Sequence, residues 1–231
     1  MIRAQLLILI MISGVANSQE YRLSESQMDT YADNVCSCIS KGDLKKNNER
    51  LLDNCSKEYL PKIEKGKQKE EINNGFDPDV FEKAYKSVSN LMYDLQKVLV
   101  HKCDFFYDIV EEGRRTSSFK KEKAEGEIEK KIDSLTALIN TNTDKDLVWE
   151  RGIRYFISGE LDKAEQDFRS NLSMGKDLKS SYFLAWVLES KGEYKEAIQL
   201  YEQVYKGNGK KYIPVIIEVV KRKAQRNSSL D

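Results

Sequence analysis

The chain has 231 residues, of which 33% are charged, and its 38 Lys and Arg residues equal its 38 Asp and Glu residues in number. This balance excludes a strong long-range attraction to nucleic acid or to an anionic membrane surface, so neither is an expected partner. Three prolines, 12 glycines and many Lys and Glu residues are typical of an all-helical protein.

The first 18 residues have the pattern of a cleavable secretory signal peptide. Arg3 is followed by an apolar run from Ala4 to Ile12 and then by small residues up to Ser18. The run is well short of the ~20 apolar residues that span a bilayer, which argues against a retained anchor. We therefore expect cleavage after Ser18, a mature chain that begins at Gln19, and a secreted or periplasmic location.

Three helices are predicted in the N-terminal half of the mature chain. A capping box at Ser24-Glu25-Ser26-Gln27 begins the first, which ends near Gly42. The second runs from about residue 48 to residue 60. The third begins at Asp77-Pro78, and its apolar stripe continues unbroken to about residue 111.

All four cysteines lie on these predicted helices. In an exported protein an even number of cysteines favours disulfide bonds, and four cysteines can pair in three ways. Cys36 and Cys38 are roughly 160° apart around the first helix, so a bond between them is the least favourable pairing. Cys55 and Cys103 lie on the apolar faces of the second and third helices. We predict two disulfide bonds that fasten these helices to the first, and the connections stay open.

Two other uses of the cysteines are less favoured. A zinc site is disfavoured because the spacing is irregular and lacks a C-x-x-C pair. A redox-active pair is disfavoured because the sequence around Cys36 and Cys38 does not resemble the start of a thioredoxin-type helix. We expect neither a metal nor a cofactor.

Residues 113–127, which include Arg114, are charged and weakly patterned, and we interpret them as a solvated loop or helix face. Apolar residues at helical spacing then predict a fourth helix from residue 128 to residue 139, followed by a loop. We place a domain boundary at this loop, which gives an N-terminal helical domain of residues 19–140 and a C-terminal domain of residues 141–231.

Two stretches of the C-terminal domain repeat each other 33 residues apart: GELDKA at 159–164 and GEYKEA at 192–197. Each follows an apolar helical pattern, and each is followed by an aromatic residue four positions later. The repeated unit is therefore predicted to be a helix, a tight turn and a second helix.

The repeated unit resembles the tetratricopeptide repeat over residues 147–206. The family's small and aromatic positions are matched by Gly152, Tyr155, Ala164 and Phe168 in the first copy and by Ala185, Leu188, Ala197 and Tyr201 in the second. The resemblance implies antiparallel helices that approach closely at the small residues. In the first copy Val148 and Arg151 replace the family's tryptophan and leucine, and neither copy has the closing proline.

Two repeats need a cap, because such arrays generally contain about three units or more. An amphipathic helix that begins near Pro214 is expected to cover the second copy with Ile213, Ile216, Ile217 and Val220. We interpret the basic tail, residues 221–226, as a solubilising end without a role in binding nucleic acid. The expected fold class is all-α, with a helical N-terminal region and a short tetratricopeptide-like solenoid that ends in a capping helix.

The resemblance also implies a concave groove lined by the first helix of each copy. By position, the lining is apolar and aromatic: Trp149, Ile153, Phe156, Tyr182 and Trp186. The family's lysine and asparagine clamp for a terminal carboxylate is not supported, because Trp149 and Ile153 stand at the first pair of its positions. Either the aromatic row binds a peptide or partner helix, or the protein's own fourth helix covers it. The second reading is favoured because an open aromatic groove promotes aggregation.

No catalytic constellation is visible in the sequence, where His101 is the single histidine and no nucleophile has an evident base. Residues 207–210 are interpreted as a turn between helices and not as a phosphate loop. We therefore expect an exported, non-catalytic scaffold or adaptor that binds a peptide or protein partner. The alternative is an exported enzyme or small-ligand-binding protein whose site lies between the two halves.

Overall fold

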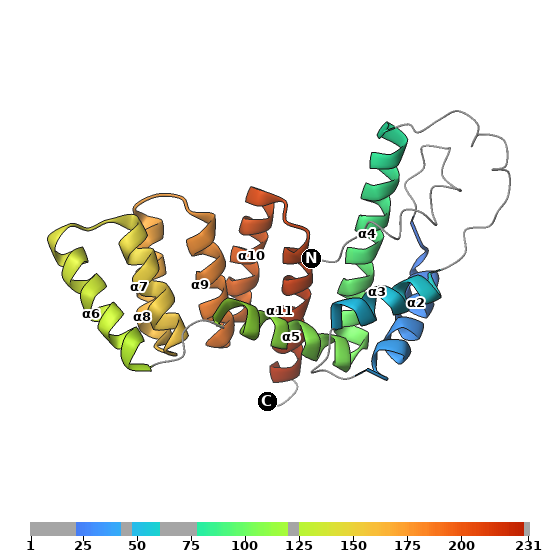
Figure 1. The fold of residues 1–231 in the computed structure, drawn as a ribbon, viewed down its shortest axis with the longest axis horizontal. Helices are drawn as coiled ribbons and strands as arrows, with labels where there is room; N and C mark the ends of the chain where they lie inside the picture. Colours follow the sequence, from blue (N-terminus) through green and yellow to red (C-terminus); the bar gives the residue numbers. More distant parts are fainter. Residues whose placement is uncertain (1–21, 43–47, 61–77, 120–124, 229–231) are drawn as a thin grey trace. The chain divides into compact units, whose positions relative to one another are not determined.

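The computed structural model describes residues 22–42, 48–60, 78–119 and 125–228, and the predicted signal peptide lies outside them. The described residues form ten helices and no strand, which confirms the all-α class (Figure 1). None of these helices is long and apolar enough to cross a lipid bilayer.

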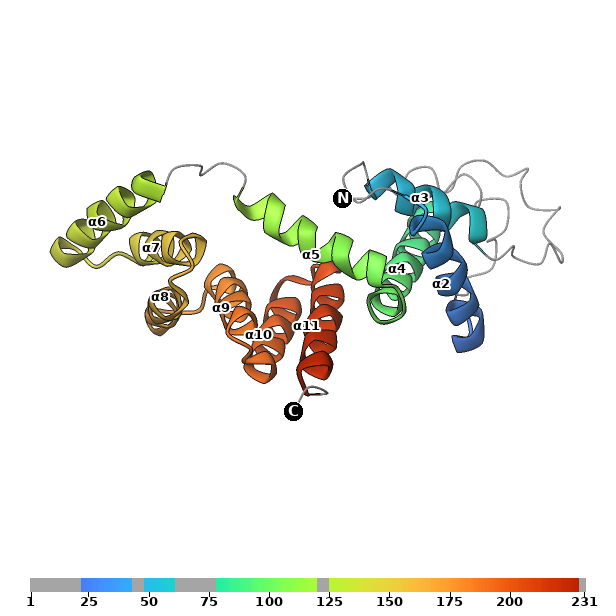
Figure 2. The same ribbon diagram turned by 90° about the horizontal axis from the view of Figure 1, so that it is seen from below.

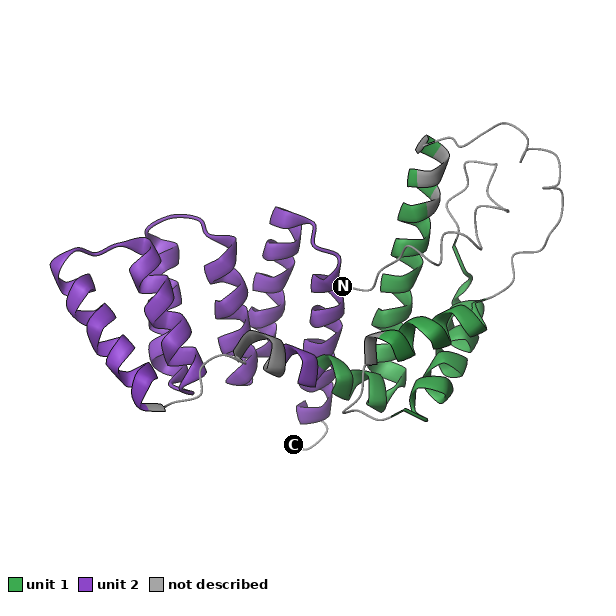
Figure 3. Cartoon of the chain, in the orientation of Figure 1, with its two compact units in different colours: residues 1–110 green, residues 111–231 purple. Residues whose placement is uncertain are grey.

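The chain divides into two compact units, residues 1–110 and residues 111–231 (Figure 3). All four cysteines belong to the first unit, and both copies of the repeat belong to the second. The loop near residue 140, where we expected the boundary, lies inside the second unit because the helices on either side of it pack together.

In the first unit, α2 (Glu25–Ile39) packs against both α3 (Asn48–Tyr59) and α4 (Pro78–Lys102). The predicted capping box is present at the start of α2. The Ser24 hydroxyl accepts a hydrogen bond from the Gln27 N–H, and the Gln27 side chain accepts one from the Ser24 N–H. The apolar stripe of α2 is almost fully buried, so this helix is the central element of the unit.

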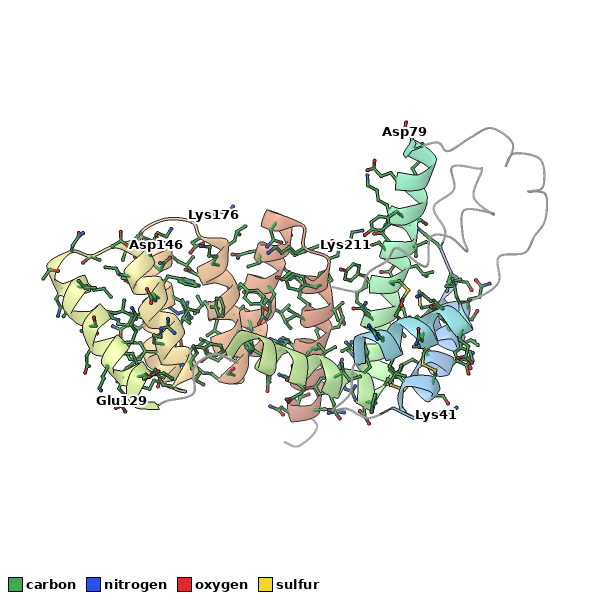
Figure 4. The ribbon with its side chains drawn as sticks, viewed as in Figure 1. Lys41, Asp79, Glu129, Asp146, Lys176 and Lys211 are labelled. Atoms are coloured by element: carbon green, nitrogen blue, oxygen red, sulfur yellow. A yellow bond between two sulfur atoms is a disulfide. The ribbon has the colours of Figure 1, made fainter. Side chains whose placement is uncertain are left out.

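Disulfide bonds fasten both neighbouring helices to α2 (yellow in Figure 4). Cys36 is bonded to Cys103 and Cys38 to Cys55, with Cα–Cα distances of 5.6 and 5.8 Å. The prediction of two bonds from the first helix is confirmed, and the connection that the sequence left open is now given. Within the described ranges, no group of three or more His, Cys, Asp or Glu residues could hold a metal ion.

The expectation of one unbroken third helix was wrong. The helix is interrupted at Cys103, and α5 (Asp104–Phe119) begins at the next residue. The backbone hydrogen bonds nevertheless continue, since the Cys103 N–H donates to the Leu99 carbonyl at 2.9 Å and the Tyr107 N–H donates to the Cys103 carbonyl at 3.0 Å. The interruption is therefore local, and it falls at the residue bonded to Cys36.

The second unit contains the end of α5 and the helices α6 (Glu125–Thr141), α7 (Lys145–Ile157), α8 (Leu161–Ser173), α9 (Leu178–Ser190), α10 (Tyr194–Asn208) and α11 (Tyr212–Ser228). From α6 to α11 each helix packs against the next one along the chain, and Figure 2 shows them as a row. This arrangement is compatible with a helical repeat fold.

The sequence repeat is also a repeat of backbone geometry. Asp144 caps α7 and Asp177 caps α9, in both cases through hydrogen bonds from backbone N–H groups of the first turn to the carboxylate. The two turns contain Gly159 and Gly192 at φ 81° and 84°, a region that favours glycine because other residues are strained there. Because the cap and the turn have the same spacing in both copies, α7–α8 and α9–α10 are equivalent helix pairs.

Close packing within the first pair requires a residue without a side chain at position 152. A Cβ atom on Gly152 would lie 2.9 Å from Cε1 of Phe168 and 3.2 Å from Cβ of Asp167. Phe168 and its counterpart Tyr201 are fully buried, as are the small residues Ala164 and Ala185. The small residues therefore allow the helices to approach as the sequence pattern predicted.

We expect Gly152→Val to lower the free energy of unfolding by about 2–3 kcal/mol, because the added methyl groups overpack a closed contact. Urea unfolding followed by tryptophan fluorescence measures this change. Gly126→Val is the matched control, because nothing lies within 4 Å of a Cβ atom at that position in α6. Equal effects of the two substitutions would contradict the close-packing account.

The helix α11 packs against α10 and buries Ile213, Ile216, Ile217 and Val220, as expected of a cap. Gly209 ends α10 with φ 63°, and the turn to α11 spans residues 209–211. The predicted turn at residues 207–210 is therefore confirmed only in its second half, because residues 207 and 208 still belong to α10. The interpretation of the tail as a solubilising end was wrong at Arg222, which α11 buries, whereas Lys221 and Arg226 are exposed.

Candidate functional site

The predicted groove residues come together on α7 and α9, the first helices of the two copies. Phe183, which was not among the residues predicted from the sequence, lies at the centre of this group. Its ring centroid is 6.0 Å from that of Trp149, 6.3 Å from that of Phe156 and 6.2 Å from that of Trp186. Phe183 could have been found from its position, since it lies three residues before Trp186 and directly after Tyr182 on a helix.

The remaining contacts join the two helices into one surface, which we call the aromatic cluster: Trp149, Ile153, Phe156, Tyr182, Phe183 and Trp186. Phe156 and Trp186 have ring centroids 5.2 Å apart, in an edge-to-face arrangement. Ile153 packs against the buried core of the second unit, to which Trp186 also belongs. Trp186 is only 7% exposed, whereas the other five side chains are half-buried.

The two ends of the aromatic cluster carry different polar groups. At one end the Trp149 indole N–H is buried and has no hydrogen-bond partner among the described residues, and Lys179 Nζ lies 5.6 Å from the ring centroid. At the other end Tyr182 packs edge-on against Tyr201, with 5.5 Å between the two ring centroids. Burial raises the pKa of Tyr182 to about 12, so its phenol stays neutral at physiological pH.

Arg114 of α5 lies on α9 and is only 9% exposed, so interpreting residues 113–127 as a solvated segment was wrong at this position. Its Nη1 donates to Oε1 of Glu189 at 2.9 Å and its Nη2 donates to Oε2 at 2.7 Å. This is a bidentate pair, the strongest geometry between arginine and a carboxylate. The guanidinium carbon also lies 5.0 Å from the ring centroid of Trp186.

The side chain of Glu189 is 1% exposed and accepts hydrogen bonds from further donors. Lys223 Nζ donates to Oε1 at 2.7 Å, and the Tyr201 hydroxyl donates to Oε2 at 3.1 Å. Burial raises the pKa of Glu189, but hydrogen bonds and attraction from Arg114 and Lys223 outweigh it and hold that pKa below its ordinary value. The carboxylate is therefore ionised at neutral pH.

A second carboxylate balances the two cations. Glu111, one turn before Arg114 on α5, accepts a hydrogen bond from Arg114 Nη1 at 2.9 Å and forms an ion pair with Lys223. Two buried or partly buried cations therefore face two carboxylates, so each charge removed from water has an opposite charge beside it. The charged groups at this end of the cluster are therefore paired with one another.

The fourth predicted helix, α6, lies beside α7 at the end of the row (Figure 2). Its Thr136 hydroxyl accepts a hydrogen bond from Arg151 at 3.2 Å, and its Lys131 lies 3.6 Å from Glu150. The segment that lies on Trp186 comes instead from α5. The chain thus covers Trp186 with Arg114 of α5, and the polar contacts of α6 are made to Glu150 and Arg151, which are outside the aromatic cluster.

The described part of the chain is all-helical, and its second unit is compatible with a helical repeat fold. In that unit the aromatic cluster lies on α7 and α9, the first helices of the two equivalent pairs. Comparison with protein-family models, with curated proteins and with solved structures gave no match to this chain.

Proposed function

We propose that this protein is an exported, non-catalytic interaction module whose tetratricopeptide-type array binds a peptide or a segment of a partner protein. The observation that carries the proposal is the aromatic cluster on α7 and α9. Half-buried aromatic side chains on equivalent helices are typical anchors for a bound peptide, since they offer a large apolar area with little loss of side-chain entropy.

The assignment to the tetratricopeptide type is supported by the way in which the chain compensates its departures from the family pattern. Arg151 stands at a position where the family has leucine. In the structure Arg151 forms a bidentate pair with Asp167 of α8, at 2.8 and 2.7 Å. An ion pair between the two helices therefore replaces an apolar contact, and the helix pair keeps its close approach at Gly152.

Export is supported by the cysteines. Disulfide bonds persist in oxidising compartments and are rare where thiols are kept reduced. Two such bonds in the first unit are therefore compatible with a secreted or periplasmic protein, as the predicted signal peptide also implies.

A selection of displayed random peptides on the purified, oxidised protein tests the proposal. We expect the enriched peptides to carry apolar or aromatic anchors and to lose about tenfold or more in affinity for Phe156→Ala and Lys179→Glu. Tyr205→Ala is the matched control, because Tyr205 is an exposed aromatic residue on α10, outside the cluster. Thermal melting of each variant establishes that the array is folded.

Two results would contradict the proposed function. One is a selection that enriches no peptide for the wild-type protein. The other is a set of peptides that bind Phe156→Ala and Lys179→Glu as tightly as they bind the wild type and Tyr205→Ala.

A further inference from the structure

Arg114 is held on α9 in the way that a protein holds an arginine ligand. Both Nη atoms of the planar guanidinium donate hydrogen bonds to the carboxylate oxygens of Glu189, at 2.9 and 2.7 Å. It lies over the ring of Trp186 at 5.0 Å, and its Nη2 contacts the Tyr201 hydroxyl at 3.1 Å. We call Trp186, Glu189 and Tyr201 the arginine seat.

The chemistry of the seat discriminates between cations. A guanidinium is planar and presents parallel N–H donors that match both oxygens of a carboxylate, whereas an ammonium is a point charge that cannot make this pair. A guanidinium also stacks well on a tryptophan ring. The seat therefore fits arginine better than lysine.

The occupant belongs to α5, which is not one of the helices of the repeated pairs. Its contacts with α9 and α11 include those made by the long side chains of Glu111 and Arg114. When Arg114 leaves, Glu189 keeps its hydrogen bonds from Lys223 at 2.7 Å and from Tyr201 at 3.1 Å. The buried carboxylate is therefore still paired in the vacated seat, which lowers the cost of exchange.

The seat is continuous with the aromatic cluster, because Trp186 belongs to both and lies 5.2 Å from Phe156 between ring centroids. A peptide anchored on the cluster can thus reach the seat with a neighbouring side chain. We propose that the arginine seat is a recognition site for an arginine-bearing peptide of a partner, and that Arg114 occupies it in cis until the partner arrives. This inference rests on the proposed function and names the chemistry of its ligand.

Occupation in cis has a measurable consequence. A partner meets a free seat only in the fraction of molecules in which Arg114 has left, and its apparent affinity is reduced by that fraction. Removing the Arg114 side chain should therefore strengthen binding of an arginine peptide, which is the opposite of what removal of an ordinary structural contact does.

The test uses the full-length oxidised protein and two short probes, acetyl-Ala-Arg-Ala-amide and the same peptide with lysine. The chain has two tryptophans, so Trp149→Phe leaves Trp186 as the single fluorescent reporter in the seat. In this background we expect Arg114→Ala to bind the arginine peptide about tenfold more tightly than the parent does, and about tenfold more tightly than it binds the lysine peptide. Adding Glu189→Gln to Arg114→Ala should abolish this preference.

Arg114→Lys provides the second variant, because it keeps a positive charge near Glu189 but cannot form the bidentate pair. We expect it to bind the arginine peptide more tightly than the parent does. Circular dichroism melting follows the fold of both variants. The proposal is wrong if the folded variants bind neither peptide, or bind both equally. It is also wrong if both variants fail to fold, because Arg114 would then be part of the core.

Failure here is distinguishable from failure of the proposed function. Selected peptides that lack arginine and still depend on Phe156 would support the docking surface and contradict the seat. Arginine binding by Arg114→Ala, in a protein that enriches no peptides, would support the seat and contradict the docking surface.

Discussion

Removal of the Cys36–Cys103 bond is expected to cause the largest loss of stability in the first unit. This bond closes a sequence separation of 67 residues, and the Cys38–Cys55 bond closes one of 17. From loop-closure entropy, we expect the paired serine substitutions at positions 36 and 103 to cost about 4 kcal/mol and those at 38 and 55 about 3 kcal/mol. Both effects arise largely because the bonds restrict the unfolded chain.

The two tryptophans make this prediction specific to one unit, because Trp149 and Trp186 both lie in the second unit. Reduction should lower far-UV circular dichroism and remove protection from hydrogen exchange in α2 and α3, while tryptophan fluorescence stays unchanged. The control is a variant with serine at all four cysteine positions, on which the reductant should have no effect. Simultaneous loss of the tryptophan signal, or full exchange protection after reduction, would show that the bonds do not have this role.

Glu189→Ala is expected to destabilise the second unit by about 3 kcal/mol, because it leaves the two cations Arg114 and Lys223 with Glu111 as the one carboxylate between them. Arg114→Ala should cost less, about 1–2 kcal/mol, because Glu189 keeps Lys223 and Tyr201 as donors. Urea unfolding followed by tryptophan fluorescence measures both. Arg169→Ala is the control, since Arg169 forms its ion pairs with Glu165 and Glu196 at the surface, and such pairs contribute less than about 1 kcal/mol.

The contribution of Glu189 to the free energy of unfolding also has a predictable pH dependence. Its pKa is lowered from the ordinary value of 4.5 in the folded protein, so the unfolded chain binds the proton more tightly. The stabilising contribution is therefore complete above pH 4.5 and is lost as the pH falls from there through the folded pKa. The stability difference between wild type and Glu189→Gln should shrink over this range. A difference that is constant with pH, or an Arg114→Ala effect as large as that of Glu189→Ala, would contradict the described balance of charges.

Features that depend on local sequence could be predicted. The positions of Cys36 and Cys38 around a helix indicated that they face different neighbours, and the two bonds confirm this. Gly159 and Gly192 marked the turns because a positive φ favours glycine, and the spacing of the two copies then defined the helix pairs. These signals are set within one or two turns of helix, where sequence periodicity is most informative.

Features that depend on distant pairing could not be predicted. Arg114 lies 75 residues from Glu189, and neither residue carries a local signal that identifies the other. One clue was present, since Arg114 continues the apolar stripe of Phe106 and Val110 at a spacing of four residues. Its charge led us to interpret it as solvated, because a charge is usually exposed unless it is paired. The interruption at Cys103 likewise coincides with a bond to a residue on another helix.

The docking surface can be tested most directly with the indole N–H signals of Trp149 and Trp186, which are the only two tryptophans in the chain and both belong to the aromatic cluster. A selected peptide is titrated into ¹⁵N-labelled protein, and both indole resonances are followed by NMR. We predict that both shift and saturate together with the measured binding curve. Binding of the peptide without movement of either resonance would contradict a docking surface on α7 and α9.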